Sequence, residues 1–356
     1  MQVSKFQTPE RAASPHAARR ILIVTDAWTP QVNGVVRTLE MTGRELSAMG
    51  HSVRFATPEN ETTLPLPTYP EIRLALYPRR GLVQELDRYA PDAVHIATEG
   101  TMGLAARRLC IEKGWPFTTA FHTRFPEYVH ARFSFIPEAA VFAALRAFHA
   151  PASATMVSTP SLKRELEHNG FSHVKLWPRG VDVERFKPAG KDGLARMGLD
   201  LPRPIFLYVG RIAVEKNVEA FVSLDLPGTK IVVGEGPQRA ELQARYPNVR
   251  FLGSRTGDEL ARLYDAADVF VFPSRTDTFG LVLLEALACG VPIAAYPVAG
   301  PIDAVTDPGA GALDQDLRTA CLKALTLCPR AARAYALRHS WRASAERFLD
   351  NLAPRH

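Results

Sequence analysis

The stretch 274–301, SRTDTFGLVLLEALACGVPIAAYPVAGP, decides the fold that we predict for this chain of 356 residues. Apolar residues outnumber the single charge in 281–289, which is typical of a helix packed against a sheet. Gly290 ends this helix, and Pro292 prevents its continuation. The short apolar run 291–296 is typical of a strand that is buried on both faces. We therefore expect a loop, a helix, a turn and a buried strand.

The start of this helix has the features of an anion site. The N–H groups around Gly280, Leu281 and Val282 have no partner within a helix, and the positive end of the helix dipole lies behind them. Gly280 allows a phosphate to approach closely. Asp277 precedes the helix and Glu285 lies just over one turn inside it. Because carboxylates do not neutralise a phosphate, we expect these two to accept hydrogen bonds from neutral hydroxyls, such as those of sugars.

The spacing of Asp277 and Glu285, together with FGLVLLEALACGVP, resembles the acidic-x7-Glu motif of the retaining glycosyltransferases of family 4. This resemblance implies an α/β GT-B fold of two facing Rossmann-like domains with parallel sheets. It also implies that Asp277 is catalytic and contacts the hydroxyls of the transferred sugar, that Phe279 helps to bind the donor sugar and ribose, and that Glu285 binds the nucleotide ribose. Most members carry Glu at the first position, so Asp277 is one methylene shorter. The alternative is that Asp277 only caps a helix and Glu285 is solvated, but this leaves the other motifs unexplained.

Composition indicates a globular chain of two domains, with 46% hydrophobic residues and a formal charge of +6. The surplus is +4 up to Pro178 and +2 after it, without a dense basic run that would indicate nucleic acid. The four cysteines show no metal-type pairing, which favours a reducing cytosol. We find no signal peptide and no membrane-spanning segment in the sequence.

Strand-like runs at 20–25, 53–56, 93–97, 116–121 and 155–158 alternate with helical patterns and predict a doubly wound parallel sheet. The loop TPQVNGVVRT after the first run resembles glycolipid-making members of the family. This resemblance implies that Gly34 faces the donor diphosphate and that Asn33 lies on the acceptor side. Taken alone, Asn33-Gly34 is more often an ordinary turn.

His122, in AFHTRFPEY, follows one of these strands at its carboxyl end, where open sheets bind their ligands. A lone histidine is more often a structural group, but the resemblance to the strand-end histidine of the family favours a catalytic, donor-side role. Glu99 and Arg124 are weaker candidates on the acceptor side. Segment 128–150 is either a core helix or an interfacial segment that inserts aromatic side chains among lipid headgroups.

A second series of strands is predicted at 205–209, 230–233, 250–252 and 269–272. GRIAVEKN follows the first of them, and Arg211 and Lys216 would together neutralise a diphosphate, as the family's Arg and Lys do at these motif positions. A solvated surface pair is the alternative.

Further motifs of the second series resemble donor-binding segments of the family. The GEGP loop implies that Gly234 and Glu235 bind the donor sugar and ribose. Phe251, Leu252 and Gly253 resemble the segment that holds the base through backbone groups. The sequence DQD at 314–316 has the letters of a metal motif, but it precedes a helix, and we therefore predict Asp314 to be an N-cap.

The sequence 176–188, LWPRGVDVERFKP, has no period and resembles the family's interdomain hinge. The last helix, within 339–352, resembles the one that crosses back onto the first domain. These features predict an N-terminal acceptor-side domain of residues 1–178 plus 340–356 and a nucleotide-sugar-binding domain of residues 179–339.

We expect transfer of a hexose without metal or cofactor. The expected donor is UDP-glucose or UDP-glucuronate, with GDP-mannose as the alternative. The expected acceptor is a membrane lipid such as diacylglycerol, with a glycan precursor as the alternative. A lipid acceptor places the protein in the cytoplasm, peripherally bound to the anionic inner face of the membrane. A nucleotide-sugar epimerase and a non-catalytic nucleotide-sugar-binding protein are the rival functions.

Overall fold

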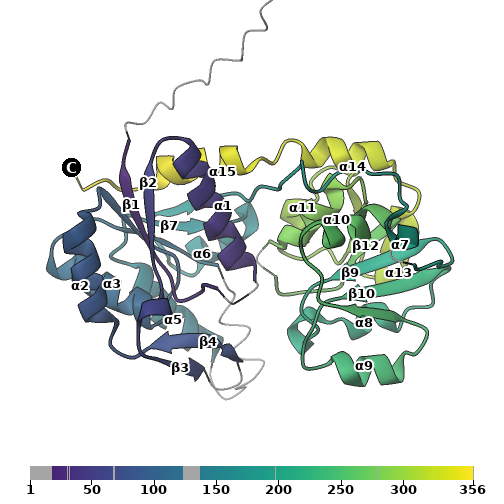
Figure 1. Ribbon diagram of the computed structural model, residues 1–356, viewed down its shortest axis with the longest axis horizontal. Helices are drawn as coiled ribbons and strands as arrows, with labels where there is room; N and C mark the ends of the chain where they lie inside the picture. Colours follow the sequence, from purple (N-terminus) through teal and green to yellow (C-terminus); the bar gives the residue numbers. More distant parts are fainter. Residues whose placement is uncertain are drawn as a thin grey trace, which may run out of the picture.

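The computed structural model describes residues 18–29, 31, 33–66, 69–122, 137–196, 198–277 and 279–355. These residues form two lobes that lie side by side, each built on a six-stranded sheet (Figure 1). Strands pair in parallel throughout both sheets. The prediction of two Rossmann-like domains with parallel sheets is therefore confirmed.

The sheet of the first lobe has the order β2-β1-β5-β6-β7-β8. Its strands are β1 (Arg20–Val24), β2 (Ser52–Ala56), β5 (Ala93–Ile96), β6 (Thr118–Ala120), β7 (Ala154–Val157) and β8 (Val174–Leu176). The surrounding helices are α1 (Gly34–Ala48), α2 (Pro78–Tyr89), α3 (Thr101–Glu112), α5 (Glu138–His149) and α6 (Pro160–His168), with a 3-10 turn at Pro58–Asn60. Strand order reverses at β1, so β1 and β5 are adjacent although β2 lies between them in the sequence.

The sheet of the second lobe has the order β11-β10-β9-β12-β13-β14 and reverses at β9. Its strands are β9 (Ile205–Val209), β10 (Thr229–Val233), β11 (Arg250–Gly253), β12 (Val269–Phe272), β13 (Ile293–Ala295) and β14 (Gly311–Leu313). Its helices are α7 (Gly193–Arg196), α8 (Glu219–Val222), α9 (Arg239–Arg245), α10 (Gly257–Ala266), α11 (Leu281–Ala288), α12 (Pro301–Ala304), α13 (Leu317–Ala324) and α14 (Pro329–Ala336), with a 3-10 turn at Val214–Lys216.

The continuous apolar runs become central strands because both of their faces are covered. In β1, Leu22 and Val24 pack toward α2 and α3, whereas Ile21 and Ile23 pack toward α1 and the last helix, α15 (Trp341–Asn351). Side chains on both faces of such a strand are buried, and the sequence therefore shows no alternation of apolar and polar residues.

Helix α15 lies against α1 of the first lobe, although it follows the whole second lobe in the sequence (Figure 1). Its Phe348 ring lies 4.9 Å from the ring of Trp177, and both side chains are fully buried. The two lobes are therefore tied by the linker after β8 and by the return of the chain into α15.

Three features differ from the sequence predictions. An antiparallel hairpin, β3 (Thr63–Leu66) with β4 (Tyr69–Ala75), was not expected, and neither were the three-residue strands β8 and β14, which are too short to show a period. Asp314 is not the N-cap of α13. Asp316 accepts from the backbone N–H groups of Arg318 and Thr319, while Asp314 pairs with Lys323.

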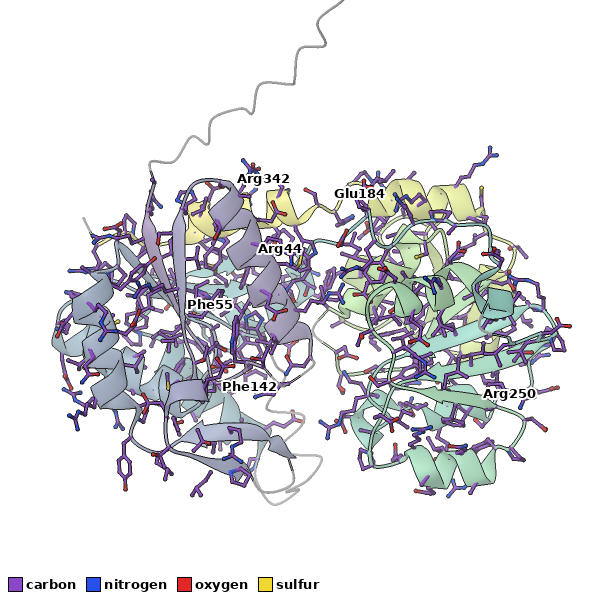
Figure 2. All side chains as sticks on the ribbon, viewed as in Figure 1. Arg44, Phe55, Phe142, Glu184, Arg250 and Arg342 are labelled. Carbon is purple, nitrogen blue, oxygen red and sulfur yellow. The ribbon has the colours of Figure 1, made fainter. Side chains whose placement is uncertain are left out.

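The described part of segment 128–150 supports the core interpretation. Leu145 and Phe148 of α5 are buried, and Phe142, labelled in Figure 2, packs against the cluster that contains Leu145. Residues 128–136 lie outside the described residues. In the described part of the chain, no helix is long and apolar enough to cross a membrane.

Candidate active site

The central feature of the second lobe is an ion pair at the point where its strand order reverses. Lys216 ends the 3-10 turn after β9, Asp277 follows β12, and the ammonium group of Lys216 donates to Oδ1 of Asp277. Their side chains are 23% and 14% exposed. Since ligands of open α/β sheets bind outside the carboxyl ends of the strands at such a reversal, the pair occupies the expected ligand position.

Helix α11 begins beside this pair, and its N-cap residue has no side chain to cap the first turn. Gly280 is the N-cap residue and has φ +80°, a left-handed conformation in which a Cβ would also lie 2.9 Å from the ring of Phe272. Within the described residues, no side chain hydrogen-bonds to the N–H groups of Leu281 or Val282. The geometry expected of a phosphate site is thus present. The ring of Phe279, however, is buried in the core, so only its backbone is available to a sugar.

Glu285 is buried rather than solvated, and the idea of a solvated surface group is therefore wrong. Its side chain is 6% exposed and accepts a 2.9 Å hydrogen bond from the hydroxyl of Tyr264. Arg37 of α1 reaches across from the first lobe and lies 3.2 Å from the other carboxylate oxygen. Burial raises the pKa of Glu285, while Arg37 and the Tyr264 hydroxyl act in the opposite direction.

Arg37 is a residue that the sequence analysis missed. Its guanidinium also lies 5.3 Å from the ring centre of Phe186 in the linker. In the same region Gly34 approaches α11, since a Cβ there would lie 3.8 Å from the Leu281 side chain. The first turn of α1 and the first turn of α11 are therefore neighbours, as the predicted role of Gly34 requires.

The loops after β9 and β10 are fixed to each other. The N–H of Ile212 donates to the carbonyl of Glu235 at 2.9 Å, and the Tyr208 hydroxyl donates to the carbonyl of Arg211 at 2.8 Å. Gly234 has φ +141°, and a Cβ there would collide with the Gly210 carbonyl. The glycine in the GEGP loop is thus required by the close approach of two loops, which also places Arg211 at the same edge of the sheet as Lys216.

Glu235 lies beside the segment predicted to hold the base. A Cβ on Gly253 would lie 3.1 Å from Oε1 of Glu235 and 3.5 Å from Nη1 of Arg239, and these two side chains form an ion pair. The ion pair holds the pKa of Glu235 below its usual value. The structure therefore brings Glu235 to the strand β11, which contains Phe251, Leu252 and Gly253. Arg250, labelled in Figure 2, is the first residue of this strand.

In the first lobe, His122 follows β6 and contacts a buried arginine. Arg179 donates to Nδ1 of His122 at 3.1 Å, and the His122 ring lies 5.6 Å from that of Trp177. Burial, Arg179 and His95 together hold the pKa of His122 well below its usual value. His122 is therefore a neutral group in this structure.

The weaker candidates of the first lobe have structural partners. The Asn33 side chain caps α1 by accepting from the N–H groups of Val35 and Val36. The carboxylate of Glu99 lies 3.3 Å from Nε2 of the buried His149. Arg124 lies outside the described residues.

Two hydrogen bonds between the lobes add to the Arg37 contact. The Ser161 N–H and hydroxyl, at the start of α6, donate to Oδ1 of Asp303 on α12 at 3.2 and 3.0 Å.

No group of three or more His, Cys, Asp or Glu residues in the described part of the chain could hold a metal ion.

The two facing Rossmann-like domains with parallel sheets place the chain in the GT-B fold class. Residues 32–185 match Glycosyltransferase Family 4, and residues 203–326 match Glycosyl transferases group 1. The chain belongs to glycosyltransferase family 4, as the sequence resemblance predicted.

Named relatives and solved structures agree with this assignment. The chain is 31% identical over 318 residues to a GDP-mannose-dependent alpha-mannosyltransferase of Mycobacterium tuberculosis, covering 83% of each chain. It is 26% identical over 367 residues to an alpha-monoglucosyldiacylglycerol synthase of Streptococcus pneumoniae, covering 92% of this chain and 83% of that one. The sucrose-phosphate synthase structure from Thermosynechococcus elongatus superposes with a TM-score of 0.78 at 22% identity, covering 93% of this chain and 98% of that one.

Proposed function

We propose that this protein is a retaining, metal-independent glycosyltransferase that moves a hexose from a nucleotide diphosphate sugar to a membrane lipid. The observation that carries this proposal is the uncapped start of α11, with the Lys216–Asp277 pair on one side and the buried Glu285 on the other. A diphosphate fits the N–H groups and the cation, and sugar and ribose hydroxyls fit the two carboxylates.

The chemistry follows from the charge that develops as the sugar leaves. Negative charge grows on the departing phosphate oxygen, where the first turn of α11, Lys216 and Arg211 supply N–H donors and cations. These groups perform the role that a divalent ion has in metal-dependent transferases. In a retaining mechanism of this kind, the leaving phosphate takes the proton of the acceptor hydroxyl on the same face of the sugar.

The transferase assay distinguishes this function from its rivals. We expect transfer of labelled hexose that is insensitive to EDTA and that needs an acceptor. Turnover of donor without acceptor would indicate an epimerase. Tight nucleotide binding without transfer to any extracted lipid or glycan would indicate a binding protein.

We favour UDP-glucose or UDP-glucuronate as donor because one relative is named a monoglucosyldiacylglycerol synthase and the loops of this chain resemble those of glycolipid-making members. GDP-mannose is the second candidate, favoured by the 31% identity to a GDP-mannose-dependent enzyme. Thermal shift with UDP and with GDP separates the two, because the ligand that binds more tightly gives the larger stabilisation. A larger shift with GDP would make GDP-mannose the donor.

A surface on the first lobe supports the lipid acceptor. A hollow of about 770 Å³ between β4, α2 and α3 lies away from the Lys216–Asp277 pair. The exposed apolar side chains Leu76, Tyr77 and Leu104 lie at this hollow, together with Arg79, Arg80 and Arg108. Apolar side chains that enter a headgroup layer, with arginines beside its phosphates, suit peripheral binding to the anionic inner face of the cytoplasmic membrane.

Co-sedimentation with anionic liposomes at low and high salt tests this attachment. Each basic side chain near an anionic leaflet contributes about 1 kcal/mol, so we expect weak, salt-sensitive binding. The double variant Tyr77→Ser with Arg80→Glu should lose it, whereas Ile302→Ser, which removes an exposed apolar side chain of the second lobe, should not. Binding that ignores lipid charge, or labelled product that stays out of a chloroform extract, would remove the lipid acceptor and leave the transferase.

A further inference from the structure

Arg179 is a buried cation at the beginning of the linker between the lobes. The residue is 5% exposed, and its guanidinium donates to the Trp177 carbonyl at 2.7 Å and to Nδ1 of His122 at 3.1 Å. The guanidinium carbon also lies 4.5 Å from the centre of the Trp177 ring. No carboxylate among the described residues forms an ion pair with it. Taking a guanidinium out of water is costly, so the contacts that hold it are the features to explain.

The contact fixes the tautomer of His122. A guanidinium has only N–H donors, so the Nδ1 atom that faces it must be an acceptor without a proton. Burial lowers the pKa of Arg179 only to about 9, which leaves it charged at neutral pH. The single proton of the neutral imidazole is therefore on Nε2, because the guanidinium of Arg179 can only donate to Nδ1.

The groups around the ring keep it neutral. Burial and the charge of Arg179, on the linker, both lower the pKa of His122. His95 is itself uncharged near pH 7, since burial lowers its pKa to about 3. His122 therefore has no imidazolium proton to give and no free lone pair at Nδ1 to act as a base.

We propose that Arg179 is a positioning residue that holds His122 as a neutral Nε2–H donor to an oxygen of the transferred hexose or of the leaving phosphate. The identity of that oxygen rests on the proposed transferase function, whereas the tautomer does not. His122 stabilises the substrate through a hydrogen bond and neither gives up nor takes up a proton during the reaction.

The position of Arg179 is itself set by the end of the chain. The Ser344 hydroxyl of α15 donates to the Pro178 carbonyl at 2.6 Å, and Val181 pairs with Ser340. Gly180, between them, packs so closely on Trp341 that a Cβ would collide with its backbone. The return of the chain from the second lobe thus places the guanidinium that orients His122.

Nitrogen-15 NMR of the imidazole rings in the full chain tests the proposal, with the His122 signals assigned by their loss in His122→Asn. We expect a protonated Nε2 and an unprotonated Nδ1 that do not change between pH 5.5 and 8.5. In Arg179→Met the guanidinium no longer donates to Nδ1, so the proton should divide between the two ring nitrogens, whereas Arg179→Lys, which keeps a cationic donor, should retain the original spectrum. A wild-type ring that titrates near its usual pKa, or carries its proton on Nδ1, overturns the proposal.

Activity gives an independent readout. The amide nitrogen of Gln lies near the place of Nε2, so His122→Gln should keep transfer within about tenfold of wild type, while His122→Ala loses about 100-fold. If His122 transferred a proton in the reaction, the activities of both variants would fall equally, and this outcome would also reject the inference. If the wild-type protein transfers no sugar while the ring shows the expected tautomer, the proposed function fails and the role of Arg179 in fixing the ring stands.

Discussion

The two lobes use the same helix position in opposite ways. In the first lobe, α3 follows β5, the neighbour of β1, and its first-turn N–H groups are occupied by a side chain. The carboxylate of Asp26 accepts from Met102 at 2.8 Å and from Gly103 at 3.3 Å. In the second lobe, α11 follows β12, the neighbour of β9, and no side chain among the described residues occupies its first turn.

The loops that face these helices differ in charge. Asp26 follows β1, is 5% exposed and also accepts from the hydroxyl of Thr98 at 2.9 Å. The equivalent loop after β9 carries Arg211 and Lys216 instead. One lobe therefore contains its own anion at the helix start, and the other presents cations and N–H groups to a ligand. This difference is the reason that we place the proposed nucleotide site in the second lobe.

We call the start of α11, with Arg211 and Lys216 facing it, the open site. The largest effect is expected from removing one of its cations. Lys216→Ala should lower transfer by about 1,000-fold, because the leaving diphosphate loses a charge-assisted donor. Glu285→Ala should lose nearly all activity as well, since the ribose loses its acceptor. The measure is kcat/KM with labelled donor, and Lys187→Ala, which removes an exposed lysine of the linker, is the control. Full activity in either site variant would contradict the assignment of the open site.

The contact between the lobes gives the next largest effect. Arg37 lowers the pKa of Glu285, whose burial raises it, so Arg37→Met should raise that pKa further. The ribose needs a carboxylate acceptor, which exists only above this pKa. The acidic limb of the pH–activity profile should therefore move to higher pH, with a several-fold loss at pH 6 and recovery toward pH 8. Arg44→Met, on the same helix, should leave the profile unchanged, and an equal loss at every pH would show that Arg37 acts in another way.

Local patterns predicted most of this architecture, because each depends on residues close in the sequence. The predicted strands and the helix 281–289 appear within a residue or two of their expected bounds, since apolar runs and a terminating glycine mark them, whereas the short strands β8 and β14 were missed. Arg37 was missed because its partner, Glu285, is far away in the sequence and in the other lobe. Asp26 was missed for the same reason: its partners start 72 residues later, at Thr98. The sequence shows which groups end strands but not which of them neutralise each other.

The occupied helix start of the first lobe can be tested through stability. Asp26→Ala leaves the N–H groups of Met102 and Gly103 without an acceptor in a buried place, which should cost about 2 kcal/mol of unfolding free energy. Asp26→Asn keeps one acceptor oxygen and should lose less. Chemical denaturation measures both, with Asp87→Ala on the surface of α2 as the control. If Asp26→Ala is as stable as wild type, Asp26 does not cap α3, and the contrast between the lobes disappears.

The smallest effect concerns the length of the acid in the open site. Asp277→Glu restores the residue that most family members have, and its carboxylate would reach one methylene further toward the sugar. The backbone of Asp277 packs closely on Gly300, where a Cβ would lie 2.8 Å from the Asp277 carbonyl. The longer side chain can still pair with Lys216, so we expect a change in kcat/KM of less than about tenfold, but a different order of preference among hexoses. Comparing UDP-glucose, UDP-glucuronate and GDP-mannose as donors measures that order, with Asp277→Asn as the variant that keeps length and loses charge. Because Asn cannot balance the charge of Lys216, Asp277→Asn should lose far more kcat/KM than Asp277→Glu with every donor. An equal loss in both variants would mean that the position of the side chain, rather than its charge, makes Asp277 essential.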